Sequence, residues 1–405
     1  MQNICGMTGV RTPDASIMRG ERTLFAQTQF HGGFMTRISG KLVAALAAAV
    51  FTSVSAGNLG AAEPVKLTVG YQPYDTISYS AVVIRALELW KKYLPPGSEV
   101  EFQAALQGSI IVNQMLANKQ QIGYLGDMPA VVATTKRSVA PVNLVANTGM
   151  SQGQRCNVVM VRADAPKFKS SDEAIKWLDG KVIATPQGSC AHRFLGLMIE
   201  KTKIKPSQIL NQSIEVIATN LRTGKIDGAV LWEPSVSRIG DIVGEGAGRI
   251  VATGFTFGIS DAGAIAMRED FMKQRPEIVE AWLKTELEAQ RYVLDPKNWN
   301  KVAEFVKGQT AGITVPMAWF SIYGAIPASA GGSPTRDEKP FVFDDRVTKL
   351  LLETYVYLHD TKAIDVDKPA PGALDDTVAR KVAKDAKATL PLGTIKAQDV
   401  SKAPK

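Results

Sequence analysis

A short motif, Gln-Gly-Ser, occurs at residues 107–109 and again at residues 187–189. Each copy lies where a predicted strand ends and a predicted helix begins. The first turn of a helix carries unpaired N–H groups and a partial positive charge, and a glycine there lets a ligand approach the backbone closely. Such turns can bind an anion, with the serine hydroxyl as a further donor. The alternative is that each serine only caps its helix, and both interpretations stay open.

A second signature is also duplicated, at a spacing of 105 residues. Its members are Leu116, Gly123 and Pro129 in the first copy and Leu221, Gly228 and Pro234 in the second. Two duplicated signatures in the same order indicate two lobes built on one plan. An acidic residue accompanies each copy, Asp127 in the first and Glu233 in the second. These acids either cap the following helices or pair with a ligand amine, which would suit a zwitterion.

Other side chains near the same strand ends are candidate ligand contacts. An aromatic residue there can stack on an organic ligand or pack the hinge, and His192 can bond an anion or lie at the surface. Trp232 ends a buried strand and can form a pocket wall. The candidate ligand-binding residues are Tyr71, Gln72, Gln107, Gly108, Ser109, Asp127, Met128, Gln187, Gly188, Ser189, His192, Trp232 and Glu233.

The elements that must position these residues alternate between strands and helices, which predicts an α/β fold with parallel pairing. Strands are predicted at residues 65–69, 99–105, 121–125, 157–161, 181–185, 213–217, 228–231 and 264–267. Helices are predicted at residues 78–94, 110–118, 171–178, 190–200 and 276–294, with further helices to about residue 388. Ligands of open parallel sheets bind beyond the carboxyl ends of the strands, so two facing lobes would place all four motif turns in one cleft.

The start of the chain has the features of a secretory signal peptide. Basic Arg37 and Lys41 precede a short apolar run at residues 42–54, and small residues follow it. We expect cleavage after Ala62, or second after Ala56, and translation from Met35, which would leave residues 1–34 outside the protein.

Composition excludes several classes of function. Net charge is +8, from 47 Lys and Arg against 39 Asp and Glu, and no basic run indicates nucleic-acid binding. With three Cys and three His in 405 residues, we expect no metal and no cofactor.

Five segments together resemble one known family: residues 69–73, 107–109, 122–129, 180–189 and 227–234. They are similar to the nitrate, sulfonate and taurine family of periplasmic solute-binding proteins of ABC importers. The resemblance implies a two-lobed periplasmic-binding-protein (type II) fold, each lobe a mostly parallel sheet flanked by helices. The expected divisions are residues 1–34, a signal peptide at 35–62, lobe one at 63–150 and 256–388, lobe two at 151–255, and a loosely ordered tail at 389–405.

The resemblance also implies a function. The protein is expected to be a soluble periplasmic monomer that binds a small organic anion or zwitterion, of the sulfonate or taurine type, and passes it to an inner-membrane ABC permease. Nitrate, bicarbonate or an aromatic acid are alternative ligands. A sensor that docks on a membrane receptor, and an enzyme similar to the thiamine-pyrimidine synthases, are alternative classes. We expect no enzyme, because those synthases carry a cysteine cluster that this chain lacks.

Cys156 and Cys190 are candidates for a disulfide. In the family, the strand that Cys156 opens runs antiparallel to its neighbours, which would bring its start to the cleft edge near Cys190. The periplasm is oxidising, so a bond is possible. Two unpaired thiols packed as small hydrophobic groups are the alternative. Residues 327–341 are expected to form a Gly- and Pro-rich loop, either a lid or a surface excursion.

A chain translated from Met35 should be exported and processed, because residues 35–62 hold a whole signal peptide. N-terminal sequencing of the exported protein should begin at Glu63, or at Gly57 if the second site is used. Retention of any residue before Met35 in the processed protein would contradict this expectation.

Overall fold

A computed structural model describes residues 63–405 of the chain. The predicted start at Met35 and the cleavage positions after Ala56 and Ala62 lie outside the described residues. None of the helices in the described range is long and apolar enough to cross a membrane.

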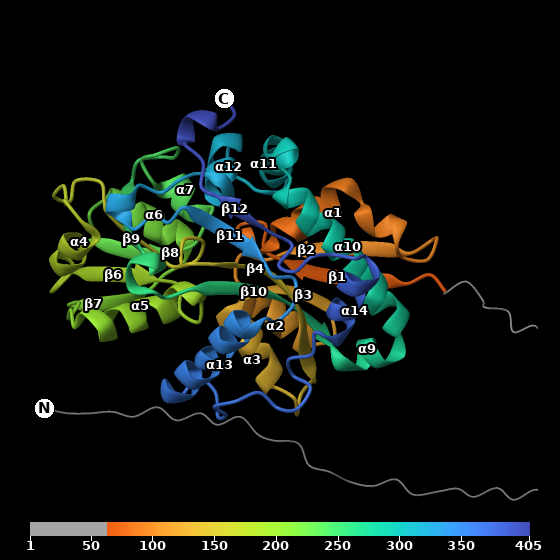
Figure 1. The fold of residues 1–405 in the computed structure, drawn as a ribbon. Helices are drawn as coiled ribbons and strands as arrows, with labels where there is room; N and C mark the ends of the chain where they lie inside the picture. Colours follow the sequence, from red (N-terminus) through yellow and green to blue (C-terminus); the bar gives the residue numbers. More distant parts are fainter. Residues whose placement is uncertain (1–62) are drawn as a thin grey trace, which may run out of the picture. The chain divides into compact units, whose positions relative to one another are not determined.

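Strands and helices alternate over most of this range, as the sequence predicts (Figure 1). The strands are β1 Lys66–Tyr71, β2 Glu99–Ala104, β3 Ile122–Gly126, β4 Val142–Ser151, β5 Val158–Arg162, β6 Val182–Thr185, β7 Gln208–Asn211, β8 Gly228–Leu231, β9 Gly248–Thr253, β10 Asp261–Arg268, β11 Thr335–Lys339 and β12 Gly393–Lys396. The α-helices are α1 Tyr79–Leu87, α2 Gly108–Leu116, α3 Asp127–Thr135, α4 Ser171–Trp177, α5 Cys190–Thr202, α6 Ile214–Arg222, α7 Ser235–Ile239, α8 Gly254–Phe257, α9 Glu269–Gln274, α10 Pro276–Leu294, α11 Trp299–Gln309, α12 Val315–Tyr323, α13 Asp345–Asp360 and α14 Thr377–Asp385. The 3-10 helices are η1 Thr76–Ser78, η2 Leu89–Lys92, η3 Pro296–Asn298, η4 Ala328–Ala330 and η5 Val400–Lys402.

These strands form two sheets. The first has the order β12-β11-β4-β10-β3-β1-β2, and the second has the order β7-β6-β8-β5-β9. We call the parts built on them the first lobe and the second lobe. In each sheet three strands run parallel, β3-β1-β2 and β7-β6-β8. The other pairs are antiparallel, so both sheets are mixed, and the predicted α/β class is confirmed.

Both faces of each sheet are buried, which explains why the central strands read as continuous apolar runs. In β3, Ile122 and Tyr124 contribute to the core on one face, and Leu125 contributes to the core on the other. Helices α1, α10, α11 and α12 cover the first face, and α2, α3 and α13 cover the second (Figure 1). In β5, Val159 and Met160 divide between the two cores of the second lobe in the same way.

The predicted strand at residues 213–217 is wrong. The strand is β7, which ends at Asn211, and α6 begins at Ile214. Ile217, Ala218 and Leu221 are buried on one face of this helix while Val216 is exposed, which is helical spacing. The predicted helix at residues 78–94 is also broken, because Glu88 adopts a left-handed conformation (φ 50°) between α1 and η2.

The segment predicted as a loop at residues 327–341 contains η4 and β11. The tail predicted to be loosely ordered contributes β12, which pairs antiparallel with β11. Both predictions failed because β11 and β12 are short and mostly polar, so an apolar pattern does not mark them.

A buried ionic network lies where the chain passes between the sheets. Arg155 is fully buried and pairs with Asp261 (3.1 Å) and Asp337 (3.0 Å). Asp337 also pairs with Lys339 at 2.7 Å. Burial lowers the pKa of Arg155, but the two carboxylates outweigh it and the net pKa is raised. The network therefore holds residue 155, at the entry to the second lobe, against β10 and β11.

Replacing Arg155 with Met should lower the free energy of unfolding by about 3–5 kcal/mol, because it leaves Asp261 and Asp337 buried without their guanidinium partner. Lys66→Met is the control. It breaks an exposed pair with Glu99 (3.2 Å) and should change stability by only ~0.5 kcal/mol. Urea denaturation measures both variants, and an Arg155→Met loss as small as the control would contradict the expectation.

Candidate functional site

One pocket lies at the ends of the parallel strands of both lobes and has about 20 Å³ of space for the centre of a water-sized sphere. We call it the cleft pocket. Its lining residues follow β1, β2 and β3 in the first lobe and β6 and β8 in the second. They are Gln72, Asp75, Gln107, Gly108, Ser109, Gly126, Pro129, Gln187, Gly188, Ser189, Cys190 and Trp232. The structure therefore brings both Gln-Gly-Ser motifs together at one site.

On the first lobe the pocket wall is the N-terminus of α2. Gln107 is the N-cap residue, and its side chain makes no capping hydrogen bond. Within residues 63–405 no acceptor bonds the N–H groups of Gly108 and Ser109 or the hydroxyl of Ser109. A Cβ on Gly108 would lie 2.5 Å from Pro129 Cγ, so glycine is also required for the packing of α2 against α3. The capping interpretation fails for Ser109 and leaves its donors free for a ligand.

On the second lobe the wall is the N-terminus of α5. Ser189 is its N-cap residue, and its hydroxyl oxygen accepts a hydrogen bond from the His192 N–H at 3.2 Å. The same hydroxyl donates to the Pro186 carbonyl at 2.7 Å. Gly188 has a φ of 76°, which favours glycine at this turn. The capping interpretation therefore holds for Ser189, whose hydroxyl already has both partners.

Asp75 also lines the cleft pocket, and the sequence analysis missed it. The residue is 4% exposed, and its Oδ1 accepts a hydrogen bond from the Ile77 N–H at 3.1 Å, which caps η1. Burial raises the pKa of Asp75 to about 7, with hydrogen bonding to Ile77 and the charge of Arg155 acting against the shift. The available signal was an acid four residues after the first strand, in the same turn as Gln72.

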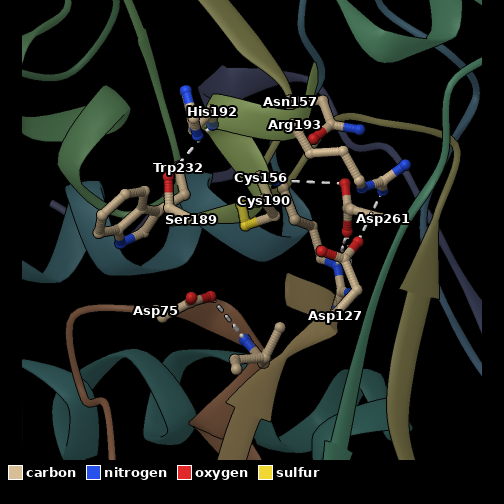
Figure 2. The surroundings of a disulfide bond; sticks show 12 residues. Asp75, Asp127, Cys156, Asn157, Ser189, Cys190, His192, Arg193, Trp232 and Asp261 are labelled. Atoms are coloured by element: carbon tan, nitrogen blue, oxygen red, sulfur yellow. Dashed lines mark hydrogen bonds and ion pairs between the residues drawn. A yellow bond between two sulfur atoms is a disulfide. The ribbon is translucent and has the colours of Figure 1, made fainter. Parts of the chain in front are cut away.

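Trp232 closes the pocket from the second lobe, as the sequence predicts for its position. Its indole Nε1 donates to the Tyr74 carbonyl at 3.0 Å, a bond that joins the lobes. Figure 2 shows Trp232 and Ser189 on one side of the gap and Asp75 on the other. Gln72, which is buried, donates to the Tyr124 carbonyl at 3.4 Å.

Asp127 and Glu233 do not line the pocket, although the sequence singled them out. Asp127 is buried and pairs with Arg193 at 2.7 Å, and of the two interpretations given above the structure does not support pairing with a ligand amine. Burial raises the pKa of Asp127, and Arg193 opposes the shift. Glu233 accepts bonds from the Ser237 N–H (2.8 Å) and hydroxyl (2.6 Å). Asp127 thus pairs with an arginine, Glu233 bonds the start of its helix and an arginine, and neither lines the pocket.

The pairing of Arg193 is the other signal that the sequence analysis missed. Arg193 is 3% exposed, and its guanidinium also donates to the Ser260 carbonyl at 2.9 Å. Arg336 of β11 pairs with Glu233 at 3.3 Å. Burial raises the pKa of Glu233, with Arg336 opposing the shift, and burial lowers the pKa of Arg336. The sequence did offer one indication of this pairing. Arg193 lies in a helix with apolar neighbours, and acids follow the ends of nearby predicted strands.

Three further candidates lie outside the pocket. The Tyr71 side chain points into the first lobe, where its hydroxyl bonds Gln309 at 2.9 Å. Met128 belongs to the core beneath α3. His192 is half-buried, and its Nδ1 accepts the Gly188 N–H at 3.4 Å, with burial lowering its pKa. The alternation of side chains along β1 places Tyr71 on the face that packs against the core. His192 is turned toward its own first turn by the bond from Gly188.

Cys156 and Cys190 form a disulfide with a Cα–Cα separation of 6.0 Å (Figure 2). Cys190 is the first residue of α5 and lines the pocket, and Cys156 precedes β5. As expected, β5 runs antiparallel to its neighbours β8 and β9. The bond therefore ties the N-terminal end of α5, at the pocket, to the segment that enters the second lobe.

Two α/β lobes whose parallel strand ends share one pocket define the two-lobed periplasmic-binding-protein fold. The model of the NMT1-like family matches residues 60–307, and the chain belongs to this family. The family resemblance that the sequence motifs indicate is thereby confirmed.

The similar proteins include a curated relative and several solved structures. The taurine-binding periplasmic protein of Escherichia coli (strain K12) is 27% identical over 307 residues, which cover 74% of this chain and 88% of the relative. The alkanesulfonate-binding protein SsuA of Xanthomonas axonopodis pv. citri, bound to MOPS, has a TM-score of 0.60 at 18% identity, covering 78% of this chain and 99% of that one. The nitrate-binding protein NrtA of Synechocystis PCC 6803 has a TM-score of 0.60 at 14% identity, covering 80% and 89%.

The same fold also occurs in an enzyme. The desulfurization enzyme DszB has a TM-score of 0.55 at 13% identity, covering 79% of this chain and 99% of that one. At these identities the solved structures establish the fold of this chain and nothing more about its ligand.

The chain that begins at Glu63 contains Cys156 and Cys190 as its two cysteines, so it should show no free thiol when denatured without reductant. Reduction should release two thiols per chain and lower the free energy of unfolding by ~2–4 kcal/mol. Thiol titration and urea denaturation measure these effects. Two free thiols before reduction would contradict the bond.

Proposed function

We propose that the protein is the periplasmic solute-binding component of an ABC importer. It captures a small organic anion or zwitterion, of the sulfonate or taurine class, in the cleft pocket and delivers it to a membrane permease. The single observation that carries the proposal is the convergence of two helix N-termini, those of α2 and α5, on one pocket between the lobes.

Backbone donors are the groups available to an anion in this pocket. No Lys, Arg or His of the described chain lines it. Each helix end carries roughly +0.5 of an elementary charge and can stabilise an anion by ~0.3–2 kcal/mol, depending on burial. A sulfonate oxygen accepts several hydrogen bonds and matches a turn that offers consecutive N–H groups.

The taurine-binding relative and the alkanesulfonate-binding neighbour support the sulfonate class among the small anions. The nitrate-binding neighbour makes nitrate the alternative to include in any test. Delivery to a permease rests on the family resemblance, and a membrane receptor remains the alternative partner.

The ligand class is tested by titration calorimetry of the processed protein with ethanesulfonate, taurine, nitrate and bicarbonate. A bound sulfonate at 100 times its Kd should also add ~2.7 kcal/mol to the free energy of unfolding. If none of these compounds binds, the proposed function is wrong.

Ser109→Asp should weaken binding of a sulfonate by about ten-fold or more, because the new carboxylate competes with the anion at the N-terminus of α2. The fold should tolerate it, since an acid in the first turn of a helix is favourable. Ser109→Asn is the neutral control of matched size and should bind within about three-fold of the parent. Equal affinities of the two variants would exclude the α2 end from the anion site.

A further inference from the structure

One side chain in the cleft pocket carries a full charge when ionised. Asp75 is that residue among the twelve that line the pocket, and it is 4% exposed. Its Oδ1 bonds the Ile77 N–H, while no donor within residues 63–405 bonds its Oδ2. No Lys, Arg or His in the described chain lies within ion-pair distance of it. A carboxylate oxygen that faces a pocket and has no partner from the protein is available to a donor on the ligand.

The charges that line the pocket balance for a zwitterion. Two helix ends contribute roughly +0.5 each, and an ionised Asp75 contributes −1, so the lining is close to neutral. A simple anion would meet the carboxylate without compensation. An amino-sulfonate places its negative group at the helix ends and its ammonium group at Asp75. Trp232 lies on the opposite wall (Figure 2), and indole attracts an ammonium group more strongly than other aromatic side chains.

We propose that Asp75 is the specificity-determining residue of the cleft pocket and receives the ammonium group of an amino-sulfonate whose sulfonate lies at the ends of α2 and α5. This inference rests on the proposed function and names its ligand class. It replaces Asp127 and Glu233 as partners of a ligand amine, since arginines already neutralise both of them.

The ionisation of Asp75 makes the preference for an amino-sulfonate over a simple sulfonate measurable. Burial raises its pKa to about 7; Arg155 lowers it, and Asp261 and Asp127 raise it. Arg155 is paired with Asp261 and Asp337, and Asp127 is paired with Arg193. An alkylammonium group titrates at pH ~10 and a sulfonate stays ionised. Among the residues that line the pocket, Asp75 is therefore the one whose charge changes around pH ~7. His192 lies outside the pocket next to Gly188, and burial lowers its pKa, so its titration falls on the acidic side of that of Asp75.

The sign of the pH dependence differs between two ligands of similar size. Taurine requires ionised Asp75, so its affinity should rise up to about ten-fold per pH unit below pH ~7 and level off above it. Ethanesulfonate lacks the amine and favours the protonated acid, so its affinity should fall as the pH rises through ~7. Titration calorimetry of both ligands over this range gives the two profiles.

Asp75→Asn keeps the cap of η1, because the Asn oxygen still accepts the Ile77 N–H. The variant should lose about ten-fold or more of its taurine affinity at pH ~8, gain affinity for ethanesulfonate, and lose both pH profiles. Asp399→Asn is the matched control. Asp399 is exposed and caps a 3-10 helix through the Ser401 N–H at 2.8 Å, and this change should leave binding unaltered.

The outcomes separate the two proposals. Opposite pH profiles that vanish in Asp75→Asn establish the inference. If both compounds bind equally, or if ethanesulfonate binds better at pH ~8, the inference is wrong and the proposed function stands. If neither binds at all, both are wrong.

Discussion

The cleft depends on the neutralisation of buried carboxylates. Asp127, Glu233 and Asp261 are each almost fully removed from water, and each meets a buried guanidinium. A buried ion that loses its partner costs several kcal/mol, so these pairs restrict how the surrounding segments can be arranged. Asp75 is buried to a similar degree and lines the same cleft, yet it has no such partner. The contrast separates the acids that maintain the fold from the one available to a ligand.

The same pairs connect the two lobes. Arg193 lies on α5 of the second lobe and Asp127 on α3 of the first, while Arg336 of β11 reaches Glu233 after β8. Neutral bonds join the lobes as well, such as the one from the Trp232 indole to the Tyr74 carbonyl. The lobes therefore meet through buried ion pairs and neutral hydrogen bonds, which fix their arrangement around the pocket.

The sequence predicted the features that depend on local pattern. Apolar periodicity located the parallel strands that carry the site, and the two Gln-Gly-Ser motifs located both helix ends of the cleft pocket. The short polar strands β11 and β12 were not predicted, because an apolar pattern does not mark them. The ion-pair partners of the buried acids were not predicted either. Whether Asp127 meets a ligand or Arg193 depends on a contact 66 residues away in the chain, and the local spacing of charged residues does not encode it.

The family motifs directed attention to Asp127 and Glu233 and away from Asp75. An acid directly after a strand end is conspicuous, whereas Asp75 lies a few residues farther on, in a turn whose path is set by its own cap on η1. The distance of an acid from the strand end was thus a poor guide to whether it lines the pocket. Whether an acid lines the pocket depends on its partners in the tertiary structure, and the sequence does not specify these partners.

The buried ionic network also reaches the N-terminal end of α5 through covalent and hydrogen bonds. Asp261 holds Arg155 and also accepts the Cys156 N–H at 3.2 Å, and Cys156 is bonded to Cys190 at the first turn of α5. The field of Arg155 and Asp261 acts on Asp75 from the other side. One cluster of charges therefore fixes the position of a helix end that stabilises negative charge and adjusts the ionisation of the carboxylate opposite it. Because both effects share Arg155 and Asp261, a change in either residue should alter the position of the α5 end and the ionisation of Asp75 together.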